Sequence, residues 1–139
     1  MRKPRAKPCP ICERIREGRT IARNRFAAAI FDGYPVTEGH ALVVPLRHEA
    51  DFFRLLKQEQ YAVLGLLREA AAGLRVFYDF DGEKIDGFNV GINVGEAAGQ
   101  TVGHAHVHLI PRRKGDVEDP RGGVRWVIPA KAKYWKDKK

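Results

Sequence analysis

The fold is decided by His104-Ala105-His106-Val107-His108-Leu109-Ile110, a stretch that holds three of the five histidines in the chain. Histidines alternate with apolar residues, which is typical of a strand with one buried face. Side chains two residues apart on a strand point the same way, about 6–7 Å apart. On a helix, at about 100° per residue, the three imidazoles would be scattered around the axis. We therefore predict a strand that turns its apolar residues toward a core and its three histidines toward the opposite face.

The length and composition indicate one globular domain. The chain has 139 residues, of which 44% are hydrophobic and 30% charged, and this length suffices for one hydrophobic core. No run reaches the roughly 18–20 apolar residues of a membrane helix. The basic residues 1–7 lead into Pro8-Cys9-Pro10 and not into an apolar leader. We expect a cytoplasmic protein that does not enter a membrane.

Positive charge is concentrated at the two ends of the chain. The formal net charge is +8, and lysines and arginines crowd residues 1–8 and the end of residues 117–139. We therefore expect a basic tail over residues 1–8, a domain over 9–116 and a C-terminal extension with a second basic tail over 117–139. Basic tails can bind nucleic acid or can simply be solvated ends, and a basic balance also suits an anionic substrate such as a nucleotide.

The two cysteines, Cys9 and Cys12, form a Cys-x-x-Cys pair near the start. A thioredoxin-like redox motif would follow a strand and open a helix. Prolines at positions 8 and 10 and the terminal location favour a metal knuckle. Since the chain has no other cysteine, two further ligands would have to be histidines or carboxylates.

The remaining pattern predicts four strands and one long helix. A helical turn is expected over residues 9–17, strands over 25–31, 40–46 and 88–94, and helical territory from residue 48 with Asp51 as N-cap. Pro45 indicates that its strand is a sheet edge or ends there. Loops are expected after Pro111, except for residues 124–128. The long helix carries a core-facing stripe at helical spacing, formed by Val63, Leu66, Leu67, Ala70, Leu74 and Phe77.

The order strand, strand, helix, strand, strand predicts an α+β fold with an antiparallel sheet. Gly65 and Gly73 weaken the interior of the long helix and permit close packing against a second subunit. We expect dimerisation through this helix and a sheet edge.

The three alternating histidines admit three interpretations: a metal site, a catalytic group, or a polar face without chemistry. The glycine-rich turn with Gln100 and Thr101, and Asn93 on the neighbouring strand, place hydrogen-bond donors beside them, which suits a phosphate. Neutral imidazole can attack phosphorus and leaves readily when the phosphorus–nitrogen bond breaks. A carbonyl that accepts from Nδ1–H would leave Nε2 free to attack.

Residues 99–112, Gly99-Gln100-Thr101-Val102-Gly103 followed by the histidine stretch and Pro111-Arg112, resemble the histidine-triad family of nucleotidyl hydrolases and transferases. The resemblance extends to Phe31-Asp32 and to residues 39–48, and it covers most of residues 9–116. Gly115-Asp116 makes the chain most similar to the diadenosine-polyphosphate-hydrolase and fragile-histidine-triad side of the family. The family implies an α+β sheet fold and a homodimer.

The resemblance also implies roles for individual residues. His106 would be the nucleophile that takes a nucleotidyl group from the α-phosphorus of a dinucleoside polyphosphate or a nucleoside phosphoramidate. The implied supporting roles are phosphate contact by His108, support of the site by His40, phosphate or leaving-group contacts by Gln100, Thr101 and Asn93, ribose binding by Asp32, and the base pocket by Ile11 and Ile30. Without the family, Asp32 could be a turn residue before Gly33, and both isoleucines could be plain core.

The family further implies a structural zinc bound by Cys9, Cys12, His48 and His104, a closed Cys₂His₂ set. Polyphosphate substrates often carry bound Mg²⁺, so we expect that Mg²⁺ can enter the site together with the substrate. The alternative function is a zinc-containing nucleic-acid-binding module that uses the basic tails. It lacks the basic surface interleaved with aromatic residues that single-strand binders have.

Overall fold

Five strands form one antiparallel sheet in the order β1-β2-β3-β5-β4 in the computed structural model, which describes residues 8–136. The strands are β1 (Ala22–Arg23), β2 (Ala27–Phe31), β3 (Ala41–Pro45), β4 (Gly87–Ile92) and β5 (Val107–Arg112). Every neighbouring pair is antiparallel. The basic tail over residues 1–8 falls outside the described residues except for Pro8, as do residues 137–139 of the C-terminal tail.

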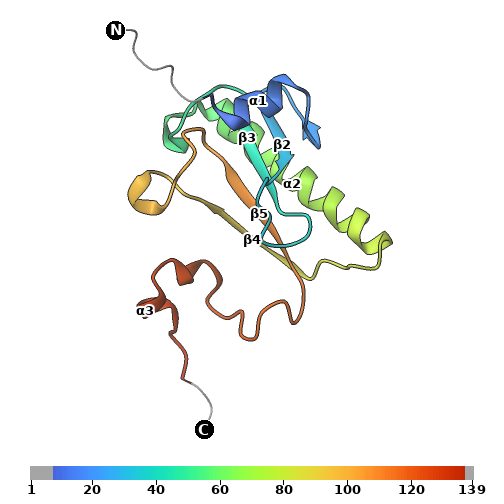
Figure 1. Cartoon of the computed structure of the whole chain (residues 1–139), viewed down its shortest axis with the longest axis vertical. Coiled ribbons are helices and arrows are strands. Elements are labelled where there is room, and N and C mark those ends of the chain that lie inside the picture. The colour runs from blue at the N-terminus through green and yellow to red at the C-terminus, as the bar shows by residue number, and fades with distance from the viewer. Residues whose placement is uncertain (1–7, 137–139) are drawn as a thin grey trace.

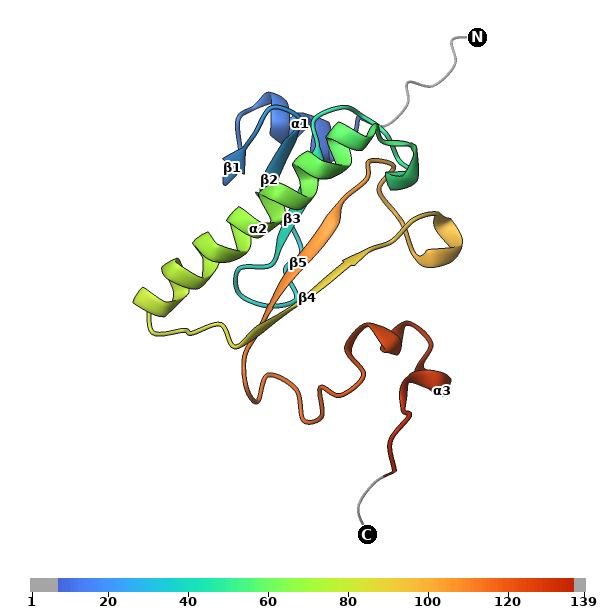
Figure 2. The ribbon, with the colours of Figure 1, turned by 180° about the vertical axis from the view of Figure 1, so that it is seen from behind.

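Helices cover the two faces of the sheet unequally (Figures 1 and 2). The long α2 (Lys57–Phe80) crosses one face, and the short α1 (Pro10–Arg16) lies over β2 and β3 on the other. Single 3₁₀ turns span Phe52–Arg54, Glu96–Ala98 and Gly123–Val127, and α3 is Pro129–Ala132. The α+β class and the antiparallel sheet with one long helix are confirmed. None of the described helices has the length and apolar character needed to span a bilayer.

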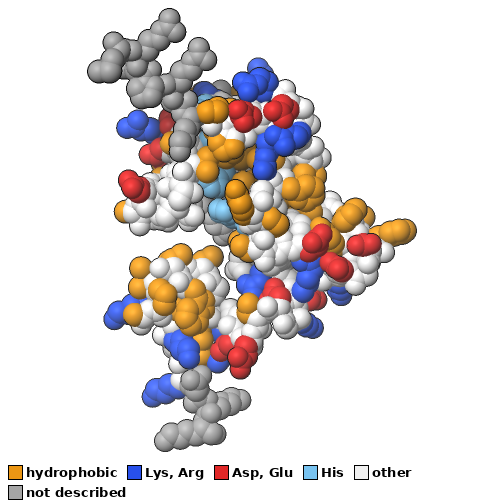
Figure 3. All heavy atoms as spheres, in the orientation of Figure 1, with side chains coloured by type: hydrophobic (Ala, Val, Ile, Leu, Met, Phe, Trp, Pro, Cys, Tyr) orange, Lys and Arg blue, Asp and Glu red, His pale blue; other side chains and the backbone are white. Residues whose placement is uncertain are grey.

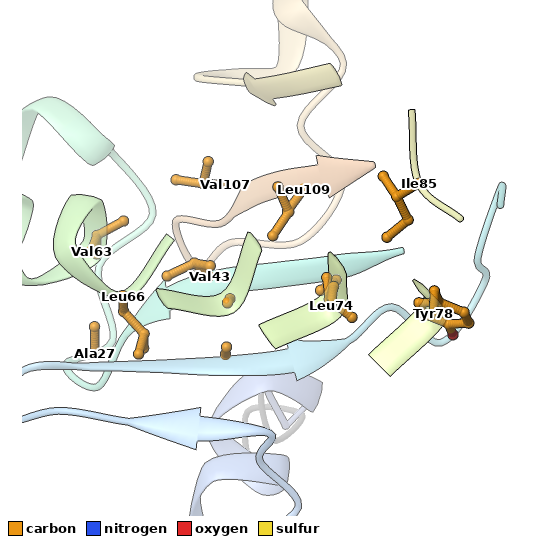
Figure 4. Close-up of a cluster of buried hydrophobic side chains, with 12 residues drawn as sticks. Ala27, Val43, Val63, Leu66, Leu74, Tyr78, Ile85, Val107 and Leu109 are labelled. Carbon is orange, nitrogen blue, oxygen red and sulfur yellow. The ribbon is translucent and has the colours of Figure 1, made fainter. Parts of the chain in front are cut away.

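The main core lies between α2 and the sheet (Figure 4). Alternate residues of each strand reach it, because strand side chains alternate between faces. Alanines on β2 let the helix approach closely, and Val107 and Leu109 of β5 are 2% and 1% exposed. Complete burial of one such valine or leucine contributes about 1.5–3 kcal/mol. The strand residues of this core are Ala27, Ala29, Ala41, Val43, Val107 and Leu109, and α2 contributes Val63, Leu66, Ala70, Leu74 and Tyr78.

The prediction that Phe77 belongs to the core-facing stripe of α2 is wrong. Phe77 is 61% exposed, and Tyr78 is the buried residue at 5%. A full turn from Leu74 ends nearer to position 78 than to 77, because a helix has about 3.6 residues per turn. Tyr78 also packs on Gly39, where an added Cβ would come within 2.6 Å of the ring, and its hydroxyl donates to Glu38 at 3.3 Å.

The histidine strand begins later than predicted and ends later. β5 starts at Val107 and continues through Pro111 to Arg112. The β3–β5 ladder stops at the pair Val43–Val107. The next residue of β3 placed to hydrogen-bond toward β5 is Pro45, which has no N–H to donate. Ala105 N–H instead donates to Glu49 O at 2.6 Å. β3 lies between β2 and β5, so the prediction that Pro45 marks a sheet edge is wrong. The alternative prediction, that the strand ends at Pro45, is confirmed.

One further prediction is corrected at the start of a helix. Asp51 caps the 3₁₀ turn Phe52–Arg54 through Phe53 N–H and does not cap α2. The first turn of α2 is closed by Glu59, whose carboxylate accepts from Leu56 N–H at 2.9 Å and pairs with Arg47. Residues 124–127 lie in the 3₁₀ turn Gly123–Val127, within a C-terminal segment that leaves the end of β5 and returns to contact β4 (Figure 1).

The face opposite α2 carries a second, smaller core and the histidines. Ile11 of α1 packs on Ala28 and Ile30 of β2 and on Leu42 and Val44 of β3. In register, Leu42 and Gly91 flank His108 on the neighbouring strands. Gly91 places no side chain beside His108, and a hollow lined by His106 and His108 lies on this face.

Candidate functional site

The hollow on the α1 face is a cavity of about 360 Å³ whose floor is formed by His106 and His108. Figure 3 shows histidine side chains at the surface of this face, among apolar side chains. One wall comes from α1 and β2, and the other from the loop that precedes the histidine stretch. The lining residues with side chains are Pro10, Ile11, Arg14, Ile30, Asp32, Tyr34, Leu42, Asn93, Thr101, Val102, His106 and His108.

His106 is held in a single orientation by its own backbone. Its Nδ1 lies 2.8 Å from His104 O, and a carbonyl can only accept, so Nδ1 carries the proton. The other nitrogen, Nε2, is therefore unprotonated in the neutral ring. The side chain is 9% exposed and reaches the cavity, so the free lone pair is available to a bound electrophile.

A second chain of hydrogen bonds fixes the proton positions of His40 and His108. Val36 N–H donates to His40 Nδ1 at 3.1 Å, so the neutral His40 ring carries its proton on Nε2. That Nε2 lies 3.0 Å from His108 Nδ1 and 3.3 Å from Asp32 Oδ2. His108 Nδ1 therefore accepts, and its Nε2–H is the donor on the cavity side.

Burial keeps these two imidazoles neutral. Burial lowers the pKa of His40, and Asp32 opposes this effect only in part. Burial also lowers the pKa of His108, helped by the neighbouring His106 and His40 rings. Both rings are consequently neutral near pH 7, so the chain of donors and acceptors is intact there.

Four sulfur and nitrogen atoms meet at the N-terminal end of the histidine stretch, in a group that can bind a metal ion. His104 Nδ1 lies 3.6 Å from Cys9 Sγ, 3.5 Å from Cys12 Sγ and 3.3 Å from His48 Nδ1, and Cys12 Sγ lies 3.3 Å from His48 Nδ1. A tetrahedral zinc ion separates two nitrogen ligands by about 3.3 Å, and a nitrogen from a sulfur by about 3.5 Å, given its usual bond lengths. The donor set and its spacing thus fit such an ion.

Hydrogen bonding also gives His104 the tautomer that a ligand needs. Its Nε2 donates to Pro45 O at 2.8 Å, which leaves Nδ1 unprotonated and directed at the two thiols. Cys12 N–H points to Cys9 Sγ at 3.4 Å, an arrangement that stabilises a thiolate. His104 is fully buried, so this end of the site is rigid.

Asp32, His40 and His108 form another compact group of metal-ligating residue types. The proton positions argue against a metal there, because the converging nitrogen of His40 is the protonated one. Moving that proton to Nδ1 would oppose the Val36 N–H that already donates to Nδ1. This group is better described as a hydrogen-bond relay.

The structure brings most of the predicted substrate-binding residues to one place. Ile11, Ile30, Asp32, Asn93, Thr101, His106 and His108 all line the cavity. His40 lies behind the cavity and reaches it through His108. Gln100 does not line it: its amide donates to Ala50 O and Val102 O, and its oxygen accepts from Gly95 N–H. As placed, Gln100 holds the loop before the histidines in shape.

Sequence reasoning missed Arg14 and Tyr34, which also line the cavity. Arg14 follows Ile11 by three residues, a spacing that puts both on one side of a helix, so the signal was present. Tyr34 is 92% exposed in the turn after Asp32, and an exposed aromatic beside a cavity is a candidate for stacking on a ligand ring.

Comparison with known proteins agrees with this geometry. A family model described as HIT domain matches residues 16–115. An uncharacterized HIT-like protein of Mycoplasma genitalium is 34% identical over 115 residues, which are 81% of this chain and 78% of that protein. An AP-4-A phosphorylase of Mycobacterium tuberculosis is 35% identical over 101 residues, 72% of this chain and 49% of the phosphorylase, so the chain spans about half of it. A zinc-bound histidine triad family protein from Mycobacterium smegmatis has a TM-score of 0.59 at 35% identity, covering 78% of this chain and 77% of that one.

Proposed function

The chain belongs to the HIT domain family, and from this premise we propose that it hydrolyses or transfers nucleotidyl groups through a covalent nucleotidyl–His106 intermediate. The observation that carries the proposal is the hydrogen bond from His106 Nδ1–H to His104 O at 2.8 Å. It leaves Nε2 as a lone-pair donor at the floor of a cavity of about 360 Å³.

The proposed reaction has two steps, transfer of the nucleotidyl group to His106 and transfer from His106 to an acceptor. His106 Nε2 attacks the α-phosphorus, a P–N bond forms, and the bond from phosphorus to the leaving group breaks. His108 Nε2–H donates to a phosphate oxygen or to the departing atom. In the second step water, or another acceptor, attacks the same phosphorus and loses its proton to solvent, the P–N bond breaks, and its electron pair returns to Nε2.

The nucleoside part of the substrate would bind at the α1 side of the cavity. Ile11 and Ile30 are 4% and 1% exposed and form an apolar wall for a base. The Asp32 carboxylate lies between this wall and His108, where it can accept from ribose hydroxyls. Asn93 and Thr101 on the opposite wall can donate to the phosphates. We propose a dinucleoside polyphosphate or a nucleoside phosphoramidate as substrate, a choice that the relative named AP-4-A phosphorylase supports.

Trapping the intermediate tests this function. The protein is mixed with a dinucleoside polyphosphate labelled at the α-phosphate and quenched in alkali, because a phosphorus–nitrogen bond survives base and breaks in acid. We expect label on the wild-type protein that acid releases, and none on His106→Ala. Turnover by His106→Ala at the wild-type rate would contradict the covalent mechanism.

We propose zinc as the ion bound by Cys9, Cys12, His48 and His104, since the tautomer of His104 and the ligand spacing suit it. All four positions are filled by protein, so the ion would be structural and would clamp α1 to the catalytic strand. Metal analysis of purified protein should give one zinc per chain, and a metal-free protein of undiminished stability would contradict the assignment.

We also propose a homodimer that forms through α2 and the free edge of β4. The exposed side of α2 carries Tyr61 and Leu64, which are 69% and 54% exposed. β4 is paired on one side only, and such an edge can accept a strand from another chain. Light scattering should give twice the chain mass, and Leu64→Glu should reduce it toward one chain.

A further inference from the structure

A second hollow begins where the nucleotide cavity ends. It has a volume of about 390 Å³ and is lined by Arg14, Gly18, Arg19, Thr20, Ile21, Phe31 and Asp32. Arg14 and Asp32 line both this groove and the nucleotide cavity. The proposed function assigns Asp32 to the ribose hydroxyls, so the groove starts at the edge of the ribose that faces away from the α-phosphate.

Arg14 is held at the boundary between the two hollows. Its Nη1 donates to Phe31 O, and its guanidinium packs against Gly33, where an added Cβ would come within 2.6 Å of Nη2. A guanidinium has five N–H donors, and its bond to Phe31 uses only one of them. The remaining donors are available to a ligand that spans the boundary.

Arg19 brings a second guanidinium to the groove through the turn that ends α1. Gly18 has a φ of +69°, which reverses the chain there, and Arg19 N–H donates to Arg14 O at 3.0 Å. Arg19 pairs with Glu17 at 2.7 Å, but both side chains are more than half exposed. An ion pair at such a surface contributes about 0–1 kcal/mol, so a phosphate can compete for Arg19.

Asp32, the carboxylate in the groove lining, already has polar contacts on the protein side. Asp32 Oδ1 accepts from Tyr34 N–H at 2.8 Å, and Oδ2 lies 3.3 Å from His40 Nε2. The groove therefore presents the Arg14 guanidinium, the Arg19 guanidinium with its exposed partner Glu17, and the Thr20 hydroxyl beside one hydrogen-bonded carboxylate. This combination favours a compact anion with several acceptor oxygens.

We propose that the groove binds a phosphomonoester on the 2′ or 3′ oxygen of the substrate ribose, and that Arg14 and Arg19 select nucleotides that carry it. The inference rests on the proposed function for the placement of the ribose. A nucleotide with two free ribose hydroxyls fills only the first cavity. A ribose phosphate extends past Asp32 and accepts charge-assisted hydrogen bonds from both arginines.

The test compares three chromogenic substrates that share one leaving group: the 4-nitrophenyl ester of adenosine 5′-monophosphate, and the same ester with a phosphate on the 2′ or the 3′ oxygen. We expect kcat/KM to be at least about tenfold higher for one of the phosphorylated esters, as one strong charged contact provides. The preferred ester identifies which ribose oxygen carries the phosphate that binds in the groove.

Arg14→Gln and Arg19→Gln should each reduce the ratio of kcat/KM for the phosphorylated ester to kcat/KM for the unphosphorylated one. Arg54→Gln, in the 3₁₀ turn Phe52–Arg54 and in the lining of neither hollow, should leave that ratio unchanged.

Calorimetric binding of adenosine 3′,5′-bisphosphate and its 2′ isomer, each against adenosine 5′-monophosphate, separates this inference from the proposed function. Equal affinities together with equal kcat/KM values overturn the ribose-phosphate site, even when the plain ester is turned over. A preference that survives both Arg14→Gln and Arg19→Gln also overturns it. If no ester is hydrolysed but a bisphosphate binds more tightly in an arginine-dependent way, the proposed catalysis fails and the groove stands.

Discussion

The histidine stretch joins two clusters that contain similar residue types and differ in where their protons lie. Cys9, Cys12, His48 and His104 form the first cluster, which we propose to be metal-ligating. In this metal-ligating cluster, His104 donates through Nε2 to Pro45 O and turns a bare Nδ1 toward Cys9 and Cys12. In the relay cluster, His40 receives Val36 N–H on Nδ1 and turns a protonated Nε2 toward His108 and Asp32. Residue identity alone does not separate the two. The backbone group behind each ring decides whether it offers a lone pair or a proton.

His106 lies between the clusters and depends on both. Its proton is held by the carbonyl of His104, a residue of the metal-ligating cluster, and its ring contacts His108 of the relay, with ring centroids 5.1 Å apart. Under the proposed function, one cluster would position the nucleophile and the other would supply protons. Substitutions at the two ends should accordingly change different measurements.

Removal of the nucleophile should have the largest effect. His106→Ala deletes the only nitrogen proposed to bond to phosphorus, so kcat/KM should fall by at least about a thousandfold. The fold and the metal content should be unchanged, because neither cluster loses a member. Steady-state kinetics beside metal analysis and a thermal melt check this, and loss of metal in this variant would show that the two ends are not separable.

Loss of the metal-ligating cluster should affect stability more than chemistry. Cys9→Ser combined with Cys12→Ser should lower the free energy of unfolding by about 3 kcal/mol or more, as expected when a structural metal is lost. Because Ile11 lies between the two cysteines and forms the base wall, KM should rise several-fold while kcat changes less.

Urea denaturation with metal analysis measures the effect of the cysteine double variant. Wild-type protein stripped by a chelator provides the matched control, and its stability should fall to that of the variant. A stripped wild type that remains much more stable than the variant would show that the cysteines act through packing alone.

A matched pair of histidine substitutions sharpens the contrast. His40→Asn breaks the relay, so kcat should fall by about a hundredfold, while bound metal is unchanged. His48→Asn removes an exposed metal ligand, so metal should be lost while kcat is reduced far less. If both variants lost metal, or both lost only kcat, the assignment of separate roles would be wrong.

The fold was predictable from the sequence where the signal is local and periodic. Alternation located the histidine strand and its buried face, and helical spacing located α2. The predicted bounds were wrong where a neighbouring element sets the end of a strand. Pro45 of β3 ends the β3–β5 ladder, so β5 starts only at Val107. The two-residue β1 has too few residues to show any period, and it exists because Ala22 and Arg23 pair with β2.

The site was predictable where chemistry restricts the residue type. Histidine and cysteine stand out against an ordinary surface, so their positions could be listed before the fold was known. Arg14 and Tyr34 are common surface residues that line the cavity only because α1 and the turn after Asp32 fold over it. Gln100 is the converse case: its residue type suits a phosphate, yet both of its side-chain N–H donors bond to backbone carbonyls of the loops around it.

The smallest expected effect is the share of the pH dependence of stability that comes from the relay. Buried His104, whose pKa burial also lowers, adds a further share. Burial lowers the pKa of both His40 and His108 below the ordinary value of 6.5. At pH values between the lowered pKa values and 6.5, the unfolded chain binds more protons than the folded one. Stability therefore falls as the pH drops through this window, and above the window the two histidines no longer reduce it. Melting temperatures from pH 7.5 to 5.5 should therefore decline in the wild type. The slope should be shallower in His40→Asn combined with His108→Asn, which keeps every metal ligand. An equally steep decline in that double variant would place the acid sensitivity outside the relay.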